Sequence, residues 1–295
     1  MADILASDLN NLITKAKNIL GTGTASFGYG QTTLSNTVTA GQLIEANQWD
    51  AVRFDILNSY LHQTGSFPSI TDVNPGNLIG QGASDPLVQY DYFADVITNN
   101  RFDVGNFGLA VSKGTATTSA SWSTNAECEI IISFPTANDA RHFFNSGSRI
   151  RIRSELILGG SPTAQDGSWR DILSNTGQVD FKGDIITVLG FYTLTNAYQE
   201  YFSASSSTPY SANQYVFSAK SNVADNSLGT ANVVYIKVRL NDSYVDPGAP
   251  APGDSVSGTL NIYVSEVTTA SLLKPSDDPF TLVSPTYSLS AISTS

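Results

Sequence analysis

Residues 127–158 read ECEIIISFPTANDARHFFNSGSRIRIRSELIL, and this stretch decides the fold class. Its two ends, 127–134 and 148–158, alternate apolar and polar residues with a period of two, which is the pattern of half-buried β-strands. Between them, Phe143 and Phe144 fall on one side of a short helical segment that Gly147 would end. The stretch therefore predicts a strand, a short helix and a second strand.

The same alternation continues toward the C-terminus, and a second short helix is predicted at 167–177. Because helices do not separate each pair of strands, two antiparallel sheets facing each other are favoured over parallel winding. The predicted fold class is α+β, mostly β, with short N-terminal helices followed by an antiparallel β-sandwich with two inserted short helices. The further predicted strands are 106–112, 184–192, 213–223, 231–242, 256–267 and 285–293.

The part of the chain before residue 107 has a helical pattern. Apolar residues recur at i, i+3 and i+4 in 8–20 and again in 45–65. Ser7 is the predicted N-cap of the first helix, and Asp85 followed by Pro86 predicts the start of a third. We divide the sequence into a helical docking segment (1–65), a connector with a short helix (66–106) and a β-sandwich domain (107–295).

The composition is acidic but poor in charge. Fifteen Lys and Arg against 26 Asp and Glu give a net charge of −11, yet only 14% of residues are charged, where about 25% is typical. A pI near 4.4 argues against a nucleic-acid binder, which needs clustered cations. No apolar run approaches the ~18 residues of a membrane span. The start, MADILASDLN, lacks the basic and apolar regions of a signal peptide, so we expect synthesis in a cytoplasm and no membrane insertion.

The residues that usually carry chemistry are few. Cys128 lies in a predicted strand, and His62 and His142 are eighty residues apart with no metal-ligand spacing around them. No nucleophile elbow, phosphate loop or dinucleotide motif is present in a supporting context. The sequence therefore predicts no catalytic residue, cofactor or metal site, and no enzyme. A hydrolase with two carboxylates in one cleft stays open as an alternative.

Three arginines stand together in a predicted strand. Alternation places Arg149, Arg151 and Arg153 on one face. We favour pairing with acids of a neighbouring strand, Glu127 and Glu129. The alternatives are an anionic contact at a subunit interface, and binding of nucleic acid or a polyanionic glycan.

Tyrosines flanked by small polar residues are a second feature, as in SSSTPYSANQYVF at 205–217. Tyrosine in this setting suits protein or sugar contacts, and it is also a common strand residue. Tyr210 and Tyr215 are therefore candidate glycan contacts.

Several motifs resemble virion structural proteins of tailed bacteriophages, especially of phages of marine cyanobacteria. The resemblance lies in 13–65, 97–102, 113–122, 134–177, 191–231, 240–247 and 257–267. Its most specific elements are GTG and GYGQ in the first loop, QW-R-D and HQTG in the second helical stretch, and ARHFFNSG at 140–147.

The resemblance implies a part of a virus particle and transfers no catalytic residue. It leaves open whether the chain belongs to the neck, tail, baseplate or a fibre. The leading hypothesis is a non-enzymatic structural component, located in the virion, that assembles through its N-terminal helices with the β domain outward and binds copies of itself and other virion proteins. Its candidate docking residues are Leu9, Leu12, Trp49 and Ile56. The alternative is an adhesin of the same particle that binds a host-surface glycan.

Overall fold

The computed structural model describes residues 5–24, 27–77, 79, 85–104, 107–183, 189–245, 255–269 and 281–295. The chain divides into two compact units whose segments alternate along the sequence. The helical unit comprises Met1–Gly108, Asn138–Ser148 and Thr268–Val283, and the sheet unit comprises Leu109–Ala137, Arg149–Val267 and Ser284–Ser295. This division differs from the predicted boundaries at 65 and 106, because two later segments return to the N-terminal helices.

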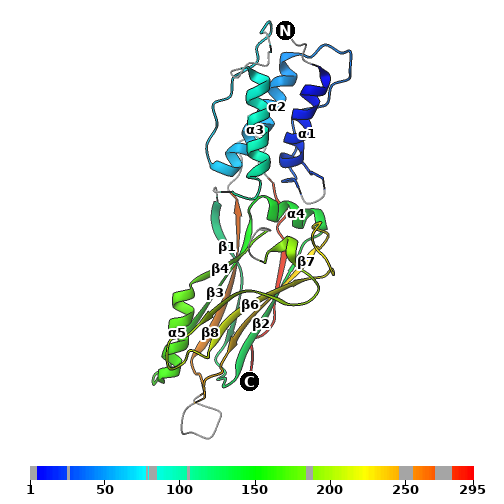
Figure 1. Cartoon of the computed structure of the whole chain (residues 1–295). Coiled ribbons are helices and arrows are strands. Elements are labelled where there is room, and N and C mark those ends of the chain that lie inside the picture. The colour runs from blue at the N-terminus through cyan, green and yellow to red at the C-terminus, as the bar shows by residue number, and fades with distance from the viewer. Residues whose placement is uncertain are drawn as a thin grey trace. The chain divides into compact units, whose positions relative to one another are not determined.

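Three helices form the body of the helical unit, α1 (Ala6–Leu20), α2 (Ala46–Thr64) and α3 (Pro86–Asn99). Each contacts the other two, and Figure 1 shows them side by side. The short helix α4 (Ala137–Asn145) belongs to the same unit, where Asn145 donates a side-chain hydrogen bond to the carbonyl of Gly28 at 2.9 Å. All four helices were predicted from their apolar spacing.

The helix ends follow local rules, with one correction. Gly65 ends α2 in the left-handed conformation at φ 75°, which glycine adopts without steric cost. The first helix begins at Ala6, so Ser7 lies inside it and is not its N-cap. The carboxylate of Asp8 instead accepts a hydrogen bond from the N–H of Leu5 at 2.8 Å, which satisfies one of the free donors at the helix start.

The sheet unit contains two antiparallel sheets, which confirms the predicted α+β, mostly β, class. The four-stranded sheet has the order β1-β8-β3-β4, and the six-stranded sheet has the order β10-β2-β7-β6-β5, with β9 also paired to β2. The strands are β1 (Phe107–Thr118), β2 (Asn125–Ser133), β3 (Arg149–Ile157), β4 (Gln178–Phe181), β5 (Gln199–Ser205), β6 (Gln214–Ser221), β7 (Val233–Asn241), β8 (Thr259–Thr269), β9 (Thr286–Leu289) and β10 (Ser293–Thr294).

The two sheets bury one face each. In β2, β3 and β7 every second side chain is buried, as period-two alternation predicts. Tyr215 of β6 donates its hydroxyl proton to Ser154 of β3 at 2.7 Å, inside the protein, and so links one sheet to the other. The helix α5 (Ala164–Thr176) connects β3 to β4 and contacts β3 and β5.

Two strands, β4 and β5, were not predicted from the sequence, and one predicted strand is wrong. Both β4 and β5 are edge strands. The four residues of β4 are too few to establish a period, and the buried and exposed positions of β5 do not alternate regularly, with an irregular pairing to β6 between Glu200 and Phe202. Of the strand predicted at 184–192, residues 184–188 lie outside the described residues. Phe191–Thr193 form a turn of 3₁₀-helix instead. Across the described ranges, no helix is both long and apolar enough to cross a membrane.

Candidate functional site

The four residues predicted to dock the N-terminal helices are buried inside the helical unit. Leu9, Leu12, Trp49 and Ile56 are each at most 1% exposed. They join one cluster with residues of α3, and the rings of Trp49 and Tyr90 meet edge to face at 5.8 Å between centroids. The prediction that these residues form a docking surface is therefore wrong. They belong to the core of the helical unit, because α3 covers the apolar faces of α1 and α2.

Both histidines also lie in the helical unit, and His62 is fully buried there. Its Nε2 is 2.9 Å from the carbonyl oxygen of Ser146, and its ring packs on Tyr29 with centroids 4.7 Å apart. Burial lowers the pKa of His62 to about 4. Burial also lowers the pKa of His142, assisted by the positive charge of Arg141. The neutral imidazole of His62 is thus a structural element of the core.

The arginine strand is β3, and its acid partner comes from β4. Asp180 accepts hydrogen bonds from Arg151 Nε at 2.8 Å and Nη2 at 2.9 Å, and from Arg149 Nη1 at 3.1 Å. Burial opposes ionisation of Asp180, but the hydrogen bonds from Arg151 and Arg149 outweigh it and hold its pKa below the ordinary value. The arginines do pair with an acid of a neighbouring strand, as predicted. That acid is Asp180 and not Glu127 or Glu129, which lie in the other sheet.

Arg153, the third arginine, has a different environment. Its guanidinium lies 4.4 Å from the ring centroid of Tyr263 and 3.4 Å from Glu155, and Tyr263 donates its hydroxyl proton to Glu155 at 2.9 Å. The Arg153 and Glu155 side chains are both 42% exposed. The arginine strand therefore has a half-buried ion-pair group at one end and an open cation–aromatic contact at the other.

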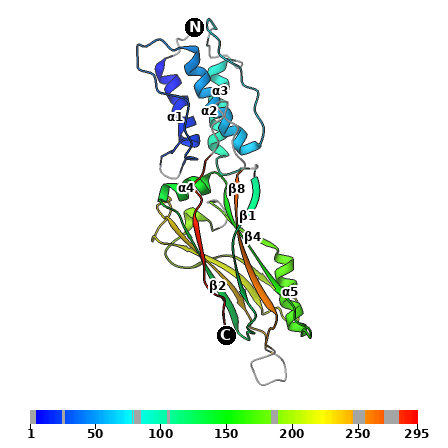
Figure 2. The same ribbon diagram turned by 180° about the vertical axis from the view of Figure 1, so that it is seen from behind.

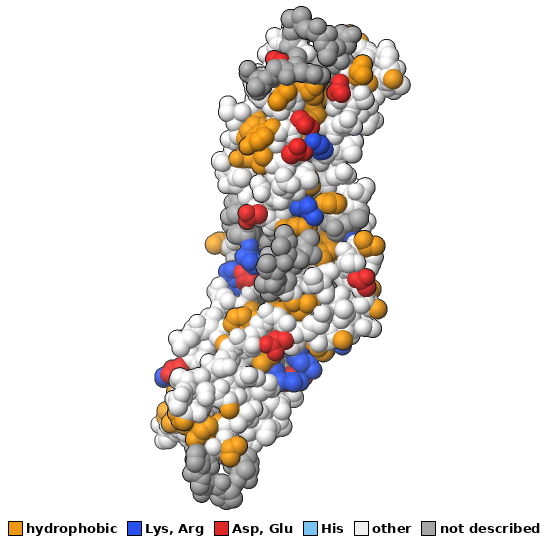
Figure 3. Space-filling view, in the orientation of Figure 1, with side chains coloured by type: hydrophobic (Ala, Val, Ile, Leu, Met, Phe, Trp, Pro, Cys, Tyr) orange, Lys and Arg blue, Asp and Glu red, His pale blue; other side chains and the backbone are white. Residues whose placement is uncertain are grey.

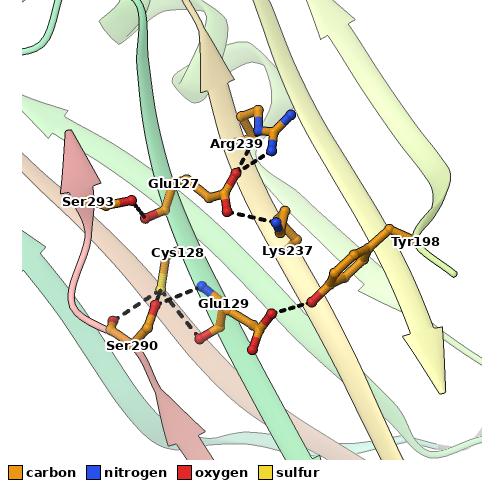
Figure 4. Close-up of polar contacts among 8 residues, drawn as sticks. All are labelled: Glu127, Cys128, Glu129, Tyr198, Lys237, Arg239, Ser290 and Ser293. Carbon is orange, nitrogen blue, oxygen red and sulfur yellow. Dashed lines mark hydrogen bonds and ion pairs between the residues drawn. The ribbon is translucent and has the colours of Figure 1, made fainter. Parts of the chain in front are cut away.

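The outer face of the six-stranded sheet carries a second charge network, shown in Figure 4. Glu127 of β2 accepts Arg239 Nε at 2.7 Å and Lys237 Nζ at 2.8 Å, both from β7. Burial alone would raise the pKa of Glu127. The hydrogen bonds from Lys237 and Arg239 outweigh burial, so the pKa of Glu127 lies below its ordinary value. The register explains the contacts, since Glu127 lies opposite Arg239 and Glu129 opposite Lys237.

Aromatic side chains extend this network. Tyr198 donates its hydroxyl proton to Glu129, as Figure 4 shows, and burial together with this acceptor raises the pKa of Tyr198 above its ordinary value. Lys237 lies 4.7 Å and Lys220 lies 4.6 Å from the centroid of the Tyr198 ring. Sequence reasoning missed this group because its members come from separate strands, although the Glu-Cys-Glu and Lys-Val-Arg alternations were visible.

Cys128 lies in β2 between Glu127 and Glu129, on the opposite face of that strand, and is fully buried. Burial raises the pKa of its thiol, and Sγ lies 3.4 Å from the carbonyl oxygen of Ser290. A thiol in this setting is a packed core group.

The two candidate glycan tyrosines differ in position. Tyr215 is fully buried between the sheets, which removes it as a contact for an external ligand. Tyr210 is half-buried and lies against Tyr244, with ring centroids 4.5 Å apart. Only Tyr210 keeps a position that a ligand could reach.

A groove of about 600 Å³ lies between α5 and the strand β5 with the loop after it. Hydroxyl and amide side chains line most of it; its apolar residues are Ile172, Phe202 and Ala204, and Asp171 is its carboxylate. Asn175, Thr176 and Ser205 make no side-chain hydrogen bond to any described residue. These three groups are therefore available to a polar ligand.

The described ranges contain no group of three or more His, Cys, Asp or Glu residues placed to hold a metal ion. Comparison of the chain with protein-family models, with curated proteins and with solved structures found no match.

Proposed function

We propose that this chain is a non-enzymatic structural component of a tailed phage particle, present as repeated copies that contact one another and other virion proteins. The motifs that resemble phage virion proteins motivate this proposal. The single structural observation that carries it is the pairing of cations with acids on the outer faces of both sheets.

This pairing leaves a surface suited to close packing between subunits. On the face shown in Figure 3, white uncharged polar groups and backbone predominate, and blue and red side chains adjoin in several small groups. Burying an unpaired charge at an interface costs several kcal/mol, whereas Asp180 and Glu127 already hold their cations within the chain. The same pairing disfavours polyanion binding by the arginine strand.

The assembly contacts in this proposal do not use the apolar stripes of α1 and α2, whose residues are core. They use other exposed surfaces of the chain. The proposed location is the neck, tail, baseplate or a fibre of the particle.

The test is direct detection in purified particles. Antibodies raised against the purified chain should label density-purified phage particles at one repeated location in electron micrographs, and mass spectrometry should find the chain at a copy number comparable to known structural proteins. Particles that infect normally and lack the chain would contradict the proposal.

A second candidate function, a host-glycan adhesin, draws on the groove beside α5. Uncommitted hydroxyl and amide groups next to an aromatic ring are the chemistry with which proteins bind neutral sugars. Saturation-transfer NMR with methyl glycosides of glucose, galactose, mannose and rhamnose tests it. Binding should weaken in Asn175→Ala and persist in Ser227→Ala, which lies outside the groove lining. Equal binding by both variants, or no binding, would exclude this groove as the sugar site.

A further inference from the structure

The strand β1 forms one edge of the four-stranded sheet, with β8 as its neighbour, as Figures 1 and 2 show. Among the described residues, no other strand pairs with its second edge. Such an edge presents a row of N–H and C=O groups that can bind another strand.

The first half of β1 is open on both faces. Leu109 is 90% and Val111 is 55% exposed, and Ala110 and Ser112 between and after them are also exposed. Because successive side chains of a strand point to opposite faces, exposure of all four means that neither face is covered by the described chain. Exposed Leu and Val on a free edge are what natural proteins usually avoid.

In the second half of the strand, Ala116 is buried and Lys113 and Gly114 are partly covered. A Cβ on Gly114 would lie 3.2 Å from Leu289 of β9, and Lys113 reaches the buried carboxylate of Glu266 at 3.2 Å. Lys113 is the only charged residue of β1, and its ion pair ties it to the chain. The usual protections of an edge, an outward charge or a proline, are therefore missing from Leu109–Ser112.

We propose that residues 108–112 of β1 pair with the same residues of a second copy, antiparallel about a two-fold axis at Ala110. This register places Leu109 opposite Val111 of the other copy, and Val111 opposite its Leu109. Apolar cross-strand pairs of this kind add to the stability that the backbone hydrogen bonds supply. Residues 108–112 of one copy are thus complementary to residues 108–112 of another copy.

Charge points to a second copy as the occupant. At a two-fold axis each residue meets its own equivalent or a near neighbour, so any charge there would face a like charge. The chain carries a net charge of −11, yet residues 107–112 carry none. The contact is smaller than a standard interface of about 1,600 Å², so we expect weak pairing in solution that repeated copies reinforce. In this respect the inference rests on the assembly role proposed above.

Cysteine cross-linking in the full-length chain tests the register. In a Cys128→Ser background, Ala110→Cys should form a disulfide-linked dimer under mild oxidation, because the two Cβ atoms at the axis come within bonding reach. Thr115→Cys is the matched control on the same strand, since its equivalents would lie ~34 Å apart along the pair. The Ala110→Cys dimer should form at least about tenfold faster.

A second variant separates pairing from random collision. We expect sedimentation of the natural chain to show a concentration-dependent dimer. Ala110→Lys brings two ammonium groups together at the axis, so it should abolish that dimer while leaving the melting temperature unchanged, because Ala110 is exposed. Equal cross-linking rates at 110 and 115, or dimerisation that survives Ala110→Lys, would overturn the inference. A chain that dimerises this way and is absent from virions would refute only the proposed function.

Discussion

His62 shows how burial changes the chemistry of a single side chain. Its pKa in the folded chain is lowered to about 4 from an ordinary 6.5. Between these values the unfolded chain binds a proton that the folded chain does not. The free energy of unfolding should therefore fall as the pH drops from about 6.5 to 4, by up to about 3 kcal/mol from this group.

This prediction is checked with His62→Gln, which keeps a donor near the carbonyl of Ser146 and removes the titration. Urea unfolding at several pH values should give a flatter dependence for the variant than for the natural chain below pH 6.5. The slope is the measurement, since the substitution also changes the stability at neutral pH. Parallel curves would show that His62 does not titrate as its burial implies.

Asp180 is the residue on which two arginines depend. Asp180→Asn removes the carboxylate that Arg149 and Arg151, only 15% and 27% exposed, share. We expect the free energy of unfolding to fall by about 1–3 kcal/mol. The measurement is chemical denaturation at pH 7.

The matched control for Asp180→Asn is Glu155→Gln, which removes the carboxylate beside Arg153. Because both partners there are 42% exposed, water screens the pair, and the change should stay within about 0.5 kcal/mol. Equal costs for the two variants would mean that burial does not distinguish the two ends of the arginine strand.

At the scale of elements, the helices α1, α2 and α3 are interdependent because each covers the apolar stripe of another. Ile56 of α2 is fully buried in their shared core. Ile56→Ala should lower the free energy of unfolding by about 2–5 kcal/mol. The association state measured by sedimentation should not change, because the side chain contacts the chain's own helices.

Leu43→Ala provides the comparison for Ile56→Ala, since Leu43 is 83% exposed in the loop before α2. It should alter stability by no more than about 0.5 kcal/mol. If Ile56→Ala impaired association and left stability intact, the original docking hypothesis would return.

Most elements were predictable because their periodicity is local. The apolar spacing of 45–65 and the stop at Gly65 gave α2 its bounds within a residue, and the alternation in 231–242 gave β7. The edge strands β4 and β5 were missed because the four residues of β4 are too few to establish a period and β5 lacks a regular alternation. Because β4 was missed, its residue Asp180 was not predicted as the acid that pairs with Arg149 and Arg151.

At the scale of the whole molecule, the end of the sequence completes the six-stranded sheet. Both β9 and β10 pair with β2, more than 150 residues earlier, and the carbonyl of Ser295 accepts hydrogen bonds from Ser123 and Thr124 at 2.8 Å each. Deleting 284–295 should therefore expose one side of β2 and make the buried thiol of Cys128 react with Ellman's reagent at least about tenfold faster.

Labelling kinetics of the deletion variant and the full chain measure this, and Cys128→Ser versions of both report the background. A thiol that stays as protected in the deletion variant would show that β2 does not need the last two strands. The circular dichroism spectrum of the deletion variant shows whether β structure persists.

The sequence by itself determined the type of each major element and the fold class, because helix and strand periods depend on burial of one face, and that pattern is written locally. It also determined the low charge of the surface. The tertiary structure decided which faces meet. In it, the residues predicted to dock, Leu9, Leu12, Trp49 and Ile56, form part of a core. Arg149 and Arg151 pair with Asp180. Leu109 and Val111 are exposed at a sheet edge. These outcomes depend on contacts between residues far apart in the chain, and no local pattern specifies them.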